Sequence, residues 1–251
     1  MATAPGSTAR TAVLWDVLAS VLAEAAAAPG RDGTVLEVVD AGGGTGGLAV
    51  PLAAAGHHVT VVDPSPDSLA ALARRAAEGG LGNRVTGLQG DLDDLAQLLA
   101  PGSADLVLCH SVLQMVDDPL AAVVALAGVL RTGGRLSLLV GNRDAAVLAR
   151  ALAGRPDEAA HVLTDPAGRW GPGDGVQRRW SPPQIIELVT AAHLQVEQVH
   201  GIRVVADLVP SGGADPDPGA PAALLALERA LADRPPFRDL ATQLHVLALR
   251  R

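Results

Sequence analysis

A run of glycines follows the first strongly apolar segment of the chain, and its composition suits it to ligand binding. The segment reads Asp40-Ala41-Gly42-Gly43-Gly44-Thr45-Gly46-Gly47. Glycines at this point let the backbone turn tightly and let a ligand come close to main-chain N–H groups. The spacing Gly42-x-Gly44-x-x-Gly47 satisfies the fingerprint of dinucleotide-binding loops, although so short a pattern has little specificity on its own.

Three interpretations of this loop are considered first: a nucleoside-triphosphate site, a dinucleotide site and a structural turn. A nucleoside-triphosphate loop needs Lys followed by Ser or Thr, and all 19 basic residues of the chain are Arg. A nicotinamide or flavin dinucleotide site is compatible with Asp63, an acid about 20 residues further on, where a ribose-binding carboxylate belongs. A glycine turn with no ligand at all is the third interpretation.

The acid directly before the glycines favours a cationic ligand. Asp40 would repel a pyrophosphate at the start of the following helix and would attract a positive charge. S-adenosylmethionine carries a sulfonium and an ammonium and no phosphate, and proteins that bind it use the spacing Asp40-x-Gly42-x-Gly44-x-Gly46. The sequence therefore favours S-adenosylmethionine, with the dinucleotide and the structural turn as alternatives.

Further polar residues follow predicted strands in the same part of the chain. Asp63 could accept hydrogen bonds from both ribose hydroxyls, or cap the helix after it. Asp91 could accept from an adenine amino group beside the Leu92 N–H, or act as a helix N-cap. His110 ends the fourth predicted strand, where methyl donor and acceptor would meet, and a satisfied structural histidine is its alternative interpretation.

Composition excludes several classes of protein. The chain has 251 residues, of which 49% are hydrophobic, and a single cysteine, Cys109. It can therefore bury a large core, but it cannot form a disulfide framework or a cysteine-rich zinc site. The seven His are scattered, so we expect no metal site. A net charge of -8 argues against broad attraction to nucleic acids or membranes. With no export signal or membrane span evident, we expect a cytoplasmic protein.

The elements that position these residues alternate along the chain. Short β-branched runs predict strands, and longer runs with apolar residues three or four apart predict helices between them. Such alternation is typical of a parallel sheet wound by right-handed crossovers and covered on both faces. The predicted strands of this part are residues 34–40, 57–63, 84–89, a run from 105 onward, and 133–141.

The alternation stops after Gly141. Residues 142–181 contain a short helix and then a segment rich in Gly, Pro, Arg and Trp, which we interpret as an insertion, or lid, over the active site. We expect 1–251 to be one domain, with a loose start at 1–9 and an N-terminal helix at 10–28. The predicted elements beyond the insertion are a helix at 181–192, a strand at 194–205, a helix at 222–232 and a strand at 241–250.

The segments VVDAGGGTGG and VVDPS resemble class I S-adenosylmethionine-dependent methyltransferases. The chain is most similar to the carboxymethoxyuridine-tRNA methyltransferases, which methylate the carboxylate of a modified wobble uridine. This resemblance covers nearly the whole chain and includes CHSVLQMVDDP, RTGGRLSLLVGN and GIRVVADLVP. It implies an α/β, Rossmann-like doubly wound sheet of seven mostly parallel strands, with the last strand antiparallel and helices on both faces.

The resemblance also implies a set of cofactor-binding residues for S-adenosylmethionine and its product S-adenosylhomocysteine. Arg10 would pair with the methionine carboxylate, although on its own it reads as a solvated arginine at a helix start. The full predicted set is Arg10, Asp40, Gly42, Gly43, Gly44, Asp63, Pro64, Asp91, Leu92 and His110.

Predictions for the acceptor side remain divided. A carboxylate is already ionised at neutral pH and needs only orientation, so we expect no catalytic base. If a catalytic residue is needed, the candidate is His110, which would lie near the methyl group. The predicted substrate-binding residues are Trp15, Asn142, Arg143 and Arg203, with a bidentate fork from one of the last two.

The insertion is where the chain departs from the family. It carries six Arg against five acids and is nearly neutral. Its Trp170 and Trp180 could stack a flipped base or simply anchor the loop. The acceptor is thus predicted to lie in the tRNA anticodon loop, or to be a small molecule under a 142–181 lid; a non-catalytic binding domain is a remote third possibility.

Overall fold

The computed structural model describes residues 11–27, 35–209 and 219–251. In these residues seven strands form one sheet in the order β3-β2-β1-β4-β5-β7-β6. β1 pairs in parallel with β2 and with β4, and β2 pairs in parallel with β3. The strands are β1 (Glu37–Ala41), β2 (His58–Asp63), β3 (Val85–Gln89), β4 (Ala104–His110), β5 (Leu130–Gly141), β6 (Gln195–Ile202) and β7 (Gln243–Leu249).

The last strand, β7, is antiparallel to its neighbour β5. At one end of β5, the Gly133 N–H donates to the Arg250 carbonyl at 2.7 Å, and at the other end the Asn142 N–H donates to the Thr242 carbonyl at 3.1 Å. Residue numbers rise along β5 as they fall along β7, so the two strands are antiparallel. The predicted α/β class with an antiparallel last strand is confirmed.

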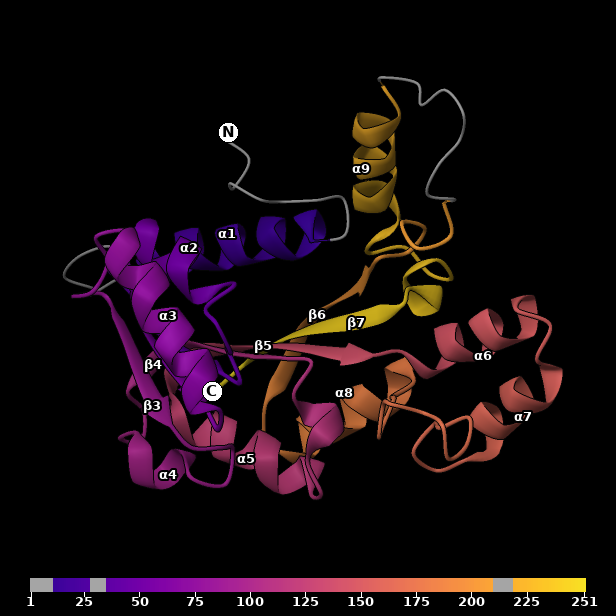
Figure 1. Cartoon of the computed structure of the whole chain (residues 1–251), viewed down its shortest axis with the longest axis horizontal. Helices are drawn as coiled ribbons and strands as arrows, with labels where there is room; N and C mark the ends of the chain where they lie inside the picture. Colours follow the sequence, from indigo (N-terminus) through magenta and orange to yellow (C-terminus); the bar gives the residue numbers. More distant parts are fainter. Residues whose placement is uncertain (1–10, 28–34, 210–218) are drawn as a thin grey trace. The chain divides into compact units, whose positions relative to one another are not determined.

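Helices cover the sheet in the part of the chain that holds β1 to β4. There α2 and α3 contact each other and β2, while α4 and α5 contact each other, and Figure 1 shows these two pairs on opposite sides of the strands. The helices are α1 (Ala12–Ala26), α2 (Ala49–Ala54), α3 (Pro66–Glu78), α4 (Leu95–Leu98), α5 (Pro119–Val129), α6 (Arg143–Leu152), α7 (Pro156–Thr164), α8 (Pro182–Ala191) and α9 (Ala220–Leu231), with short 3-10 helices η1 (Leu113–Met115) and η2 (Arg238–Leu240).

Local sequence explains several helix starts. Ser65 caps α3 by accepting from the Ser68 N–H at 3.2 Å, with Pro66 in the first turn. Asp118 caps α5 by accepting from the N–H groups of Leu120 and Ala121. Both helices thus combine a capping side chain with a proline whose missing N–H costs nothing there.

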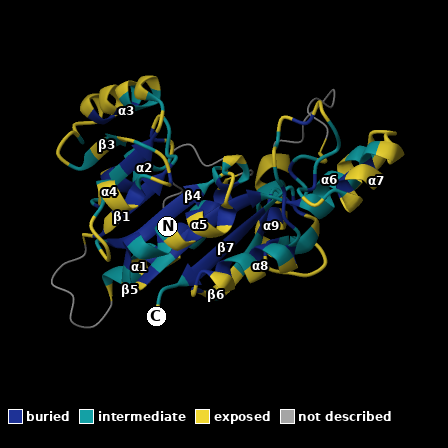
Figure 2. Ribbon diagram, turned by 90° about the horizontal axis from the view of Figure 1, so that it is seen from below, coloured by how far each residue is buried: buried dark blue, intermediate teal, exposed yellow. Residues whose placement is uncertain are grey.

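The central strands are buried because both faces of the sheet are covered. All the residues of β4 up to Cys109 are buried, as are the last three of β2. Figure 2 shows the central strands largely in dark blue, while exposed positions lie on the helices and on the edge strands β3 and β6. Continuous apolar strands of this kind are what a doubly covered parallel sheet requires.

The chain divides into two compact units. The glycine-loop unit comprises Ala19–Leu138, Glu187–Glu197 and Leu247–Arg251, and it holds β1 to β4. The insertion unit comprises Leu139–Ile186 and Gln198–Val246 with the described residues up to Leu18, and it holds α6, α7 and α9. The expectation of one domain over 1–251 stays a prediction.

The elements largely follow the sequence, with one helix missed. Residues 142–181 were expected to contain one short helix, but the structure has two, α6 and α7, which pack against each other. α7 begins at Pro156 with Asp157 and Glu158 in its first turn. Acidic residues after a first-turn proline favour a helix start, so the sequence itself carries a signal for α7. The predicted N-terminal helix 10–28 runs from Ala12 to Ala26.

A buried glutamate in the insertion unit organises the chain after β6. Glu228 on α9 is fully buried, and its carboxylate accepts from the N–H groups of Val204, Val205 and Ala206 at 2.9, 2.8 and 2.6 Å. These three residues follow the end of β6, so their N–H groups have no neighbouring strand to bond to. The carboxylate therefore replaces a row of backbone acceptors.

We predict that Glu228→Ala lowers the free energy of unfolding by about 3 kcal/mol, because three N–H groups, two of them buried, lose their acceptor. Urea unfolding followed by circular dichroism measures this loss. The control is Glu187→Ala on α8, where the side chain is exposed, and it should change stability by less than about 0.5 kcal/mol. Equal stabilities for the two variants would contradict the role given to Glu228.

Candidate functional site

The glycine loop leaves the carboxyl end of β1 in a conformation that only glycine adopts easily. Gly42, Gly44 and Gly46 have φ angles of +75°, +56° and +81°, in the left-handed region. The Gly42 N–H donates to the Val62 carbonyl at 2.7 Å, which holds the loop to the end of β2. A side chain at Gly42 would come within 2.2 Å of Val112. Backbone angles and close packing together explain the glycines.

Asp63 connects the end of β2 to the glycine loop. One carboxylate oxygen accepts from the Gly44 N–H and the other from the Ser65 N–H, both at 2.9 Å. The interpretation of Asp63 as the helix cap is wrong, because Ser65 caps α3. A carboxylate has about four acceptor positions, so each Asp63 oxygen retains capacity for a ligand hydroxyl.

Asp40 lies buried beneath the loop, with 3% of its surface exposed. Burial, and to a lesser degree the Asp63 carboxylate, raises the pKa of Asp40 to about 7. A Cβ atom on Gly43 would stand only 2.4 Å from an Asp40 carboxylate oxygen. Gly43 is therefore required for the Asp40 side chain to fit, and a positive charge nearby would favour the ionised form of Asp40.

A cavity of about 380 Å³ opens beside the loop within the glycine-loop unit. Apolar side chains and four carboxylates surround it, and none of the described residues that line it is basic. Its lining is therefore suited to an apolar ring and a cationic group, and unsuited to a pyrophosphate. The lining residues are Gly42, Val62, Pro64, Gly90, Asp91, Leu92, Asp93, Val112, Met115, Val116, Asp117 and Asp118.

Four predicted cofactor residues line this cavity, namely Gly42, Pro64, Asp91 and Leu92. Sequence reasoning missed the contribution of Val112 to Asp118, although the segment directly follows β4. The carboxyl ends of parallel strands meet at one edge of a sheet and carry ligand sites there, so its position was a usable clue. The roles of the predicted residues in binding stay predictions.

Asp91 shapes the turn between β3 and α4. Its carboxylate accepts from the Asp93 N–H at 2.9 Å, and its own N–H donates to the Asp94 carboxylate at 3.1 Å. The residue at the N-cap position of α4 is Asp94, so the N-cap interpretation of Asp91 is wrong. The turn instead presents Asp91 at the cavity.

His110 ends β4 and is held in a neutral state. Its Nε2 lies 2.9 Å from the buried Ser137 hydroxyl on β5. Burial, opposed by a hydrogen bond with the Ser137 backbone, lowers the pKa of His110 to about 4. An imidazole with so low a pKa is a weak proton acceptor at neutral pH. His110 can orient a neighbouring group through a hydrogen bond more readily than it can remove a proton.

The predicted substrate residues belong to the insertion unit, where the structure gives two of them structural contacts. The Asn142 amide donates to the carbonyls of Asp239 and Ala241 at 2.8 and 2.7 Å, and its oxygen caps α6 by accepting from the Asp144 N–H. Asn142 thus has both its donors engaged. Trp15 is half-buried on α1.

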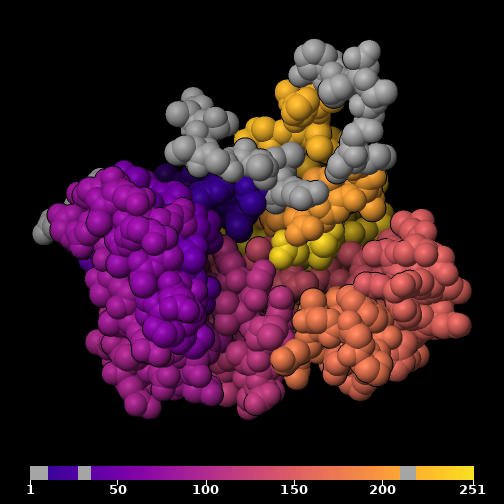
Figure 3. All heavy atoms as spheres, viewed as in Figure 1, coloured from indigo at the N-terminus to yellow at the C-terminus, as the bar shows by residue number. Residues whose placement is uncertain are grey.

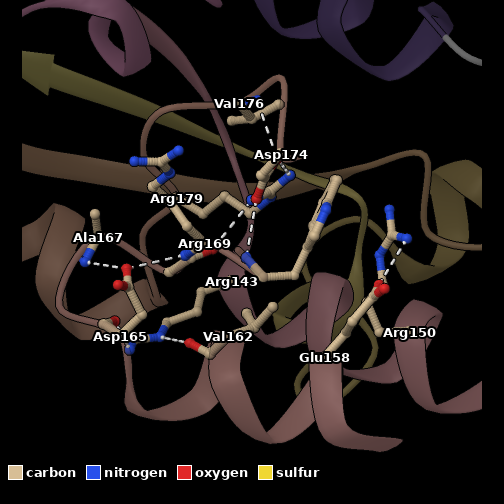
Figure 4. Close-up of polar contacts among 12 residues, drawn as sticks. Arg143, Arg150, Glu158, Val162, Asp165, Ala167, Arg169, Asp174, Val176 and Arg179 are labelled. Atoms are coloured by element: carbon tan, nitrogen blue, oxygen red, sulfur yellow. Dashed lines mark hydrogen bonds and ion pairs between the residues drawn. The ribbon is translucent and has the colours of Figure 1, made fainter. Parts of the chain in front are cut away.

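Arg143 is occupied in a similar way. Its guanidinium donates to the carbonyls of Val162 and Leu163, each at 3.0 Å, and to the Asp165 carbonyl. These carbonyls end α7, where a cation is favourable. Figure 4 shows the side chain reaching from α6 toward Val162 and Asp165. Arg143 therefore joins the two helices of the insertion.

Arg203 follows β6 with a φ of +63°, unusual for a residue with a side chain. Its guanidinium forms an ion pair with Asp207, while its Nε is buried and has no hydrogen-bond partner in the described part of the chain. A buried donor left unbonded is costly unless a ligand satisfies it. Of the two predicted arginine forks, Arg203 is the better placed to receive a ligand.

The two tryptophans of the insertion are both engaged. The Arg150 and Arg179 guanidinium carbons lie 3.6 and 4.3 Å from the centre of the Trp170 ring. Arg179 also forms a bidentate ion pair with Asp174 at 2.6 and 3.0 Å, drawn in Figure 4. Trp180 is only 5% exposed. In this conformation the structure favours the anchoring interpretation, since Trp180 is buried and Trp170 packs against two guanidiniums of the insertion.

The remaining predictions concern Arg10, a metal site and a membrane span. Arg10 lies outside the described residues. No cluster of three or more His, Cys, Asp or Glu that could hold a metal is found among residues 11–27, 35–209 and 219–251. In the same ranges, no helix has the length and apolar character needed to cross a membrane.

The chain is similar to known methyltransferases. Residues 39–138 match a family model described as a methyltransferase domain. The chain is 30% identical over 239 residues to the tRNA 5-carboxymethoxyuridine methyltransferase of Escherichia coli K12, covering 95% of this chain and 87% of that protein. It is 33% identical over 165 residues to the ubiquinone biosynthesis O-methyltransferase of Xanthomonas euvesicatoria, covering 66% and 65%.

A solved structure shows the same fold. The magnesium protoporphyrin IX methyltransferase of Synechocystis PCC 6803, determined with bound SAH, aligns with a TM-score of 0.58 at 20% identity, covering 97% of this chain and 86% of that one.

The raised pKa of Asp40 predicts a pH-dependent affinity for a sulfonium ligand. Ionised Asp40 attracts the cation, and the ionised fraction rises about tenfold from pH 6 to pH 8 for a pKa near 7. We expect the affinity of the wild-type protein for S-adenosylmethionine, relative to that of Asp40→Asn, to rise by a similar factor over this range.

Isothermal titration of both proteins at several pH values measures that ratio. The ligand's own amino group titrates alike in both experiments, so the ratio isolates Asp40. A ratio that stays constant between pH 6 and pH 8 would show that Asp40 does not sense the ligand's charge.

Proposed function

Because the chain belongs to the class I S-adenosylmethionine-dependent methyltransferases, we propose that its methyl acceptor is a carboxylate, carried by a carboxymethoxyuridine in tRNA. The observation that carries the proposal is the weak basicity of His110, whose Nε2 lies in hydrogen-bond contact with the Ser137 hydroxyl and whose pKa burial lowers to about 4. A carboxylate with a pKa of about 4 is already ionised at neutral pH and needs no base. A phenol or an amine would need one.

The site fits the cofactor of this family. The acid-lined cavity and the buried Asp40 suit a cation, and Gly42, Asp63, Asp91 and Leu92 are the residues that would hold it. When bound, S-adenosylmethionine supplies an electrophilic methyl group on a sulfonium. The protein's own contribution is then to hold the acceptor in line with that methyl group and to exclude water.

The tRNA acceptor is supported first by the extent of the similarity. The match to the tRNA enzyme covers 95% of this chain, whereas the match to the ubiquinone O-methyltransferase covers 66%. The match to the tRNA enzyme therefore includes parts of this chain that the match to the ubiquinone O-methyltransferase leaves out. A tRNA substrate would also place the enzyme in the cytoplasm.

Unpaired positive charge in the insertion is a second support. Arg150 and Arg155 pair with Glu158, and Arg179 pairs with Asp174. Arg143, Arg169 and Arg178 form no ion pair with any carboxylate of the described residues. Arg143 is bonded to the carbonyls that end α7, and Arg169 has the Asp165 carboxylate near it. Arg178 is therefore the guanidinium suited to contact with a phosphate, even on a chain whose net charge is -8.

Arg203 is the residue we propose for orienting the acceptor carboxylate. Its buried Nε has an unused donor and its ion pair with Asp207 leaves the guanidinium only partly engaged. A planar guanidinium can hold a carboxylate through two parallel hydrogen bonds. Asp207 would keep the side chain in place, since it also accepts from the Thr242 hydroxyl at 2.9 Å.

A small-molecule O- or N-methyltransferase with 142–181 as its lid is the second candidate function. The acidic net charge and the engaged tryptophans favour it, as does the similarity to an enzyme of ubiquinone biosynthesis. Steep loss of substrate affinity with rising salt would favour the nucleic acid, because counterions are released when phosphates are bound.

Transfer of tritiated methyl groups decides between the two. The enzyme is incubated with labelled S-adenosylmethionine and either total tRNA or a small-molecule extract. We expect label in tRNA that mild alkali releases, as it does for a methyl ester. Label confined to the small-molecule fraction would overturn the tRNA proposal, and alkali-stable label would overturn the carboxylate.

The absence of a general base predicts the effect of His110→Asn. Asparagine retains a hydrogen-bonding side chain but cannot take up a proton, so we expect turnover to fall less than about tenfold. At saturating cofactor, where the titration of Asp40 does not limit binding, the wild-type rate should also show no acid limb near pH 6.5, the ordinary pKa of histidine. A loss of about a hundredfold or more, with cofactor affinity unchanged, would instead identify His110 as a catalytic acid–base group.

A further inference from the structure

The glycine loop is held from two sides by side chains of the next βα unit. Asp63, at the end of β2, accepts from the Gly44 N–H at 2.9 Å. Arg75, in the last turn of α3, donates from its guanidinium to the Thr45 carbonyl at 2.7 Å, with a longer contact of 3.4 Å to the Thr45 hydroxyl. An acid and a base thus bond to two nearby peptide groups of the same loop.

Such restraint matters because the loop's own residues do little to fix its backbone. Five of the six residues from Gly42 to Gly47 are glycines, which have the largest backbone freedom to lose on ordering. Thr45 is the exception, and its carbonyl is the atom that Arg75 binds. Since a peptide group is planar, fixing the Thr45 carbonyl also fixes the direction of the Gly46 N–H.

The anchor that carries Arg75 is itself well held. α3 contacts β2, β3 and α2, and its Leu72 and Ala76 are buried. Arg75 itself is exposed, as is its neighbour Arg74. The segment containing α3 forms part of the outer surface drawn in purple in Figure 3. An exposed arginine tied to a loop carbonyl, on a helix fixed by its buried face, is suited to holding that loop in place.

We propose that Arg75 is a positioning residue for S-adenosylmethionine. Its hydrogen bond to the Thr45 carbonyl keeps the glycine loop in its binding conformation before the cofactor arrives, so that less ordering entropy is lost on binding. Arg75 acts through the loop and needs no contact with the cofactor. The proposal concerns cofactor binding alone and is independent of the identity of the methyl acceptor.

Electrostatics and loop restraint predict opposite effects when Arg75 is replaced. A positive charge near a sulfonium site weakens the binding of a cation, so removing that charge would strengthen binding. Loss of the loop restraint would weaken binding. Arg74 provides a matched control, because it is exposed on the same helix and has no hydrogen bond or ion pair in the described part of the chain.

The test measures the dissociation constants of S-adenosylmethionine and S-adenosylhomocysteine for the full-length variants Arg75→Ala, Arg75→Lys and Arg74→Ala. We expect Arg75→Ala to weaken S-adenosylhomocysteine by about five- to tenfold, as loss of one hydrogen bond from a charged donor predicts. S-adenosylmethionine should be weakened slightly less, because removal of the positive charge favours the sulfonium. Arg75→Lys should regain part of this affinity. Arg74→Ala should bind as tightly as wild type or slightly tighter.

A second measurement addresses the loop without any ligand. Amide hydrogen exchange of residues 43–47 in the cofactor-free protein should be faster in Arg75→Ala than in Arg74→Ala, while exchange within β1 and β2 stays the same. In turnover assays, Arg75→Ala should raise the KM for the cofactor and leave kcat unchanged.

The proposal is overturned if Arg75→Ala binds S-adenosylmethionine as tightly as Arg74→Ala, or if loop exchange is equal in the two variants. Weakening confined to S-adenosylmethionine, with S-adenosylhomocysteine unaffected, would also overturn it, because a restrained loop does not distinguish a sulfonium from a thioether. Faster exchange throughout β1 and β2 would show a general loss of structure and count against the proposal as well.

Discussion

Two carboxylates at adjacent strand ends are the constraint on which the cofactor site depends. Asp40 lies buried under the glycine loop and Asp63 bonds to it, so negative charge accumulates where β1 and β2 end. Their repulsion contributes to the raised pKa of Asp40. A cationic ligand relieves that repulsion and a phosphate would add to it. The choice of a sulfonium cofactor over a dinucleotide therefore follows from charge as well as from loop shape.

The glycine loop allows this arrangement because it removes side chains where the carboxylates need space. Gly43 leaves room for Asp40, and Gly42 lets the chain pass close to Val112. The same absence of side chains makes the loop flexible, and bonds from Asp63 and Arg75 offset that flexibility. The glycine backbone and the bonds that restrain it therefore act together. The parallel sheet brings the ends of the strands to the same edge.

Sequence reasoning found the fold and the centre of the site because both depend on local patterns. Alternating strands and helices, the glycine loop and Asp63 are read from neighbouring residues. The partners of these groups are not local. Arg75 reaches Thr45 across 30 positions, and Glu228 reaches the amides after β6 across 22 to 24. Such contacts follow from tertiary packing, which no periodicity in the sequence encodes.

In the insertion, residue types alone do not show which side chains are free to bind a ligand. Asn142, Arg143 and Trp170 have the residue types that bind substrates, but all three are engaged within the protein. Asn142 bonds to the carbonyls of Asp239 and Ala241, Arg143 bonds to the end of α7, and Trp170 packs against Arg150. Polar and aromatic groups in a loop must satisfy their own bonding before they can serve a ligand. Composition identified chemically capable residues, but only their contacts distinguish those already engaged from Arg203, which retains an unused donor.

The central claim is that this site is built for a sulfonium-bearing nucleoside. Calorimetric titration of the purified protein with S-adenosylmethionine and, separately, with a reduced nicotinamide dinucleotide tests it most directly. Saturable heat with S-adenosylmethionine and none with the dinucleotide is the result the account predicts. Saturable heat with the dinucleotide alone would contradict it.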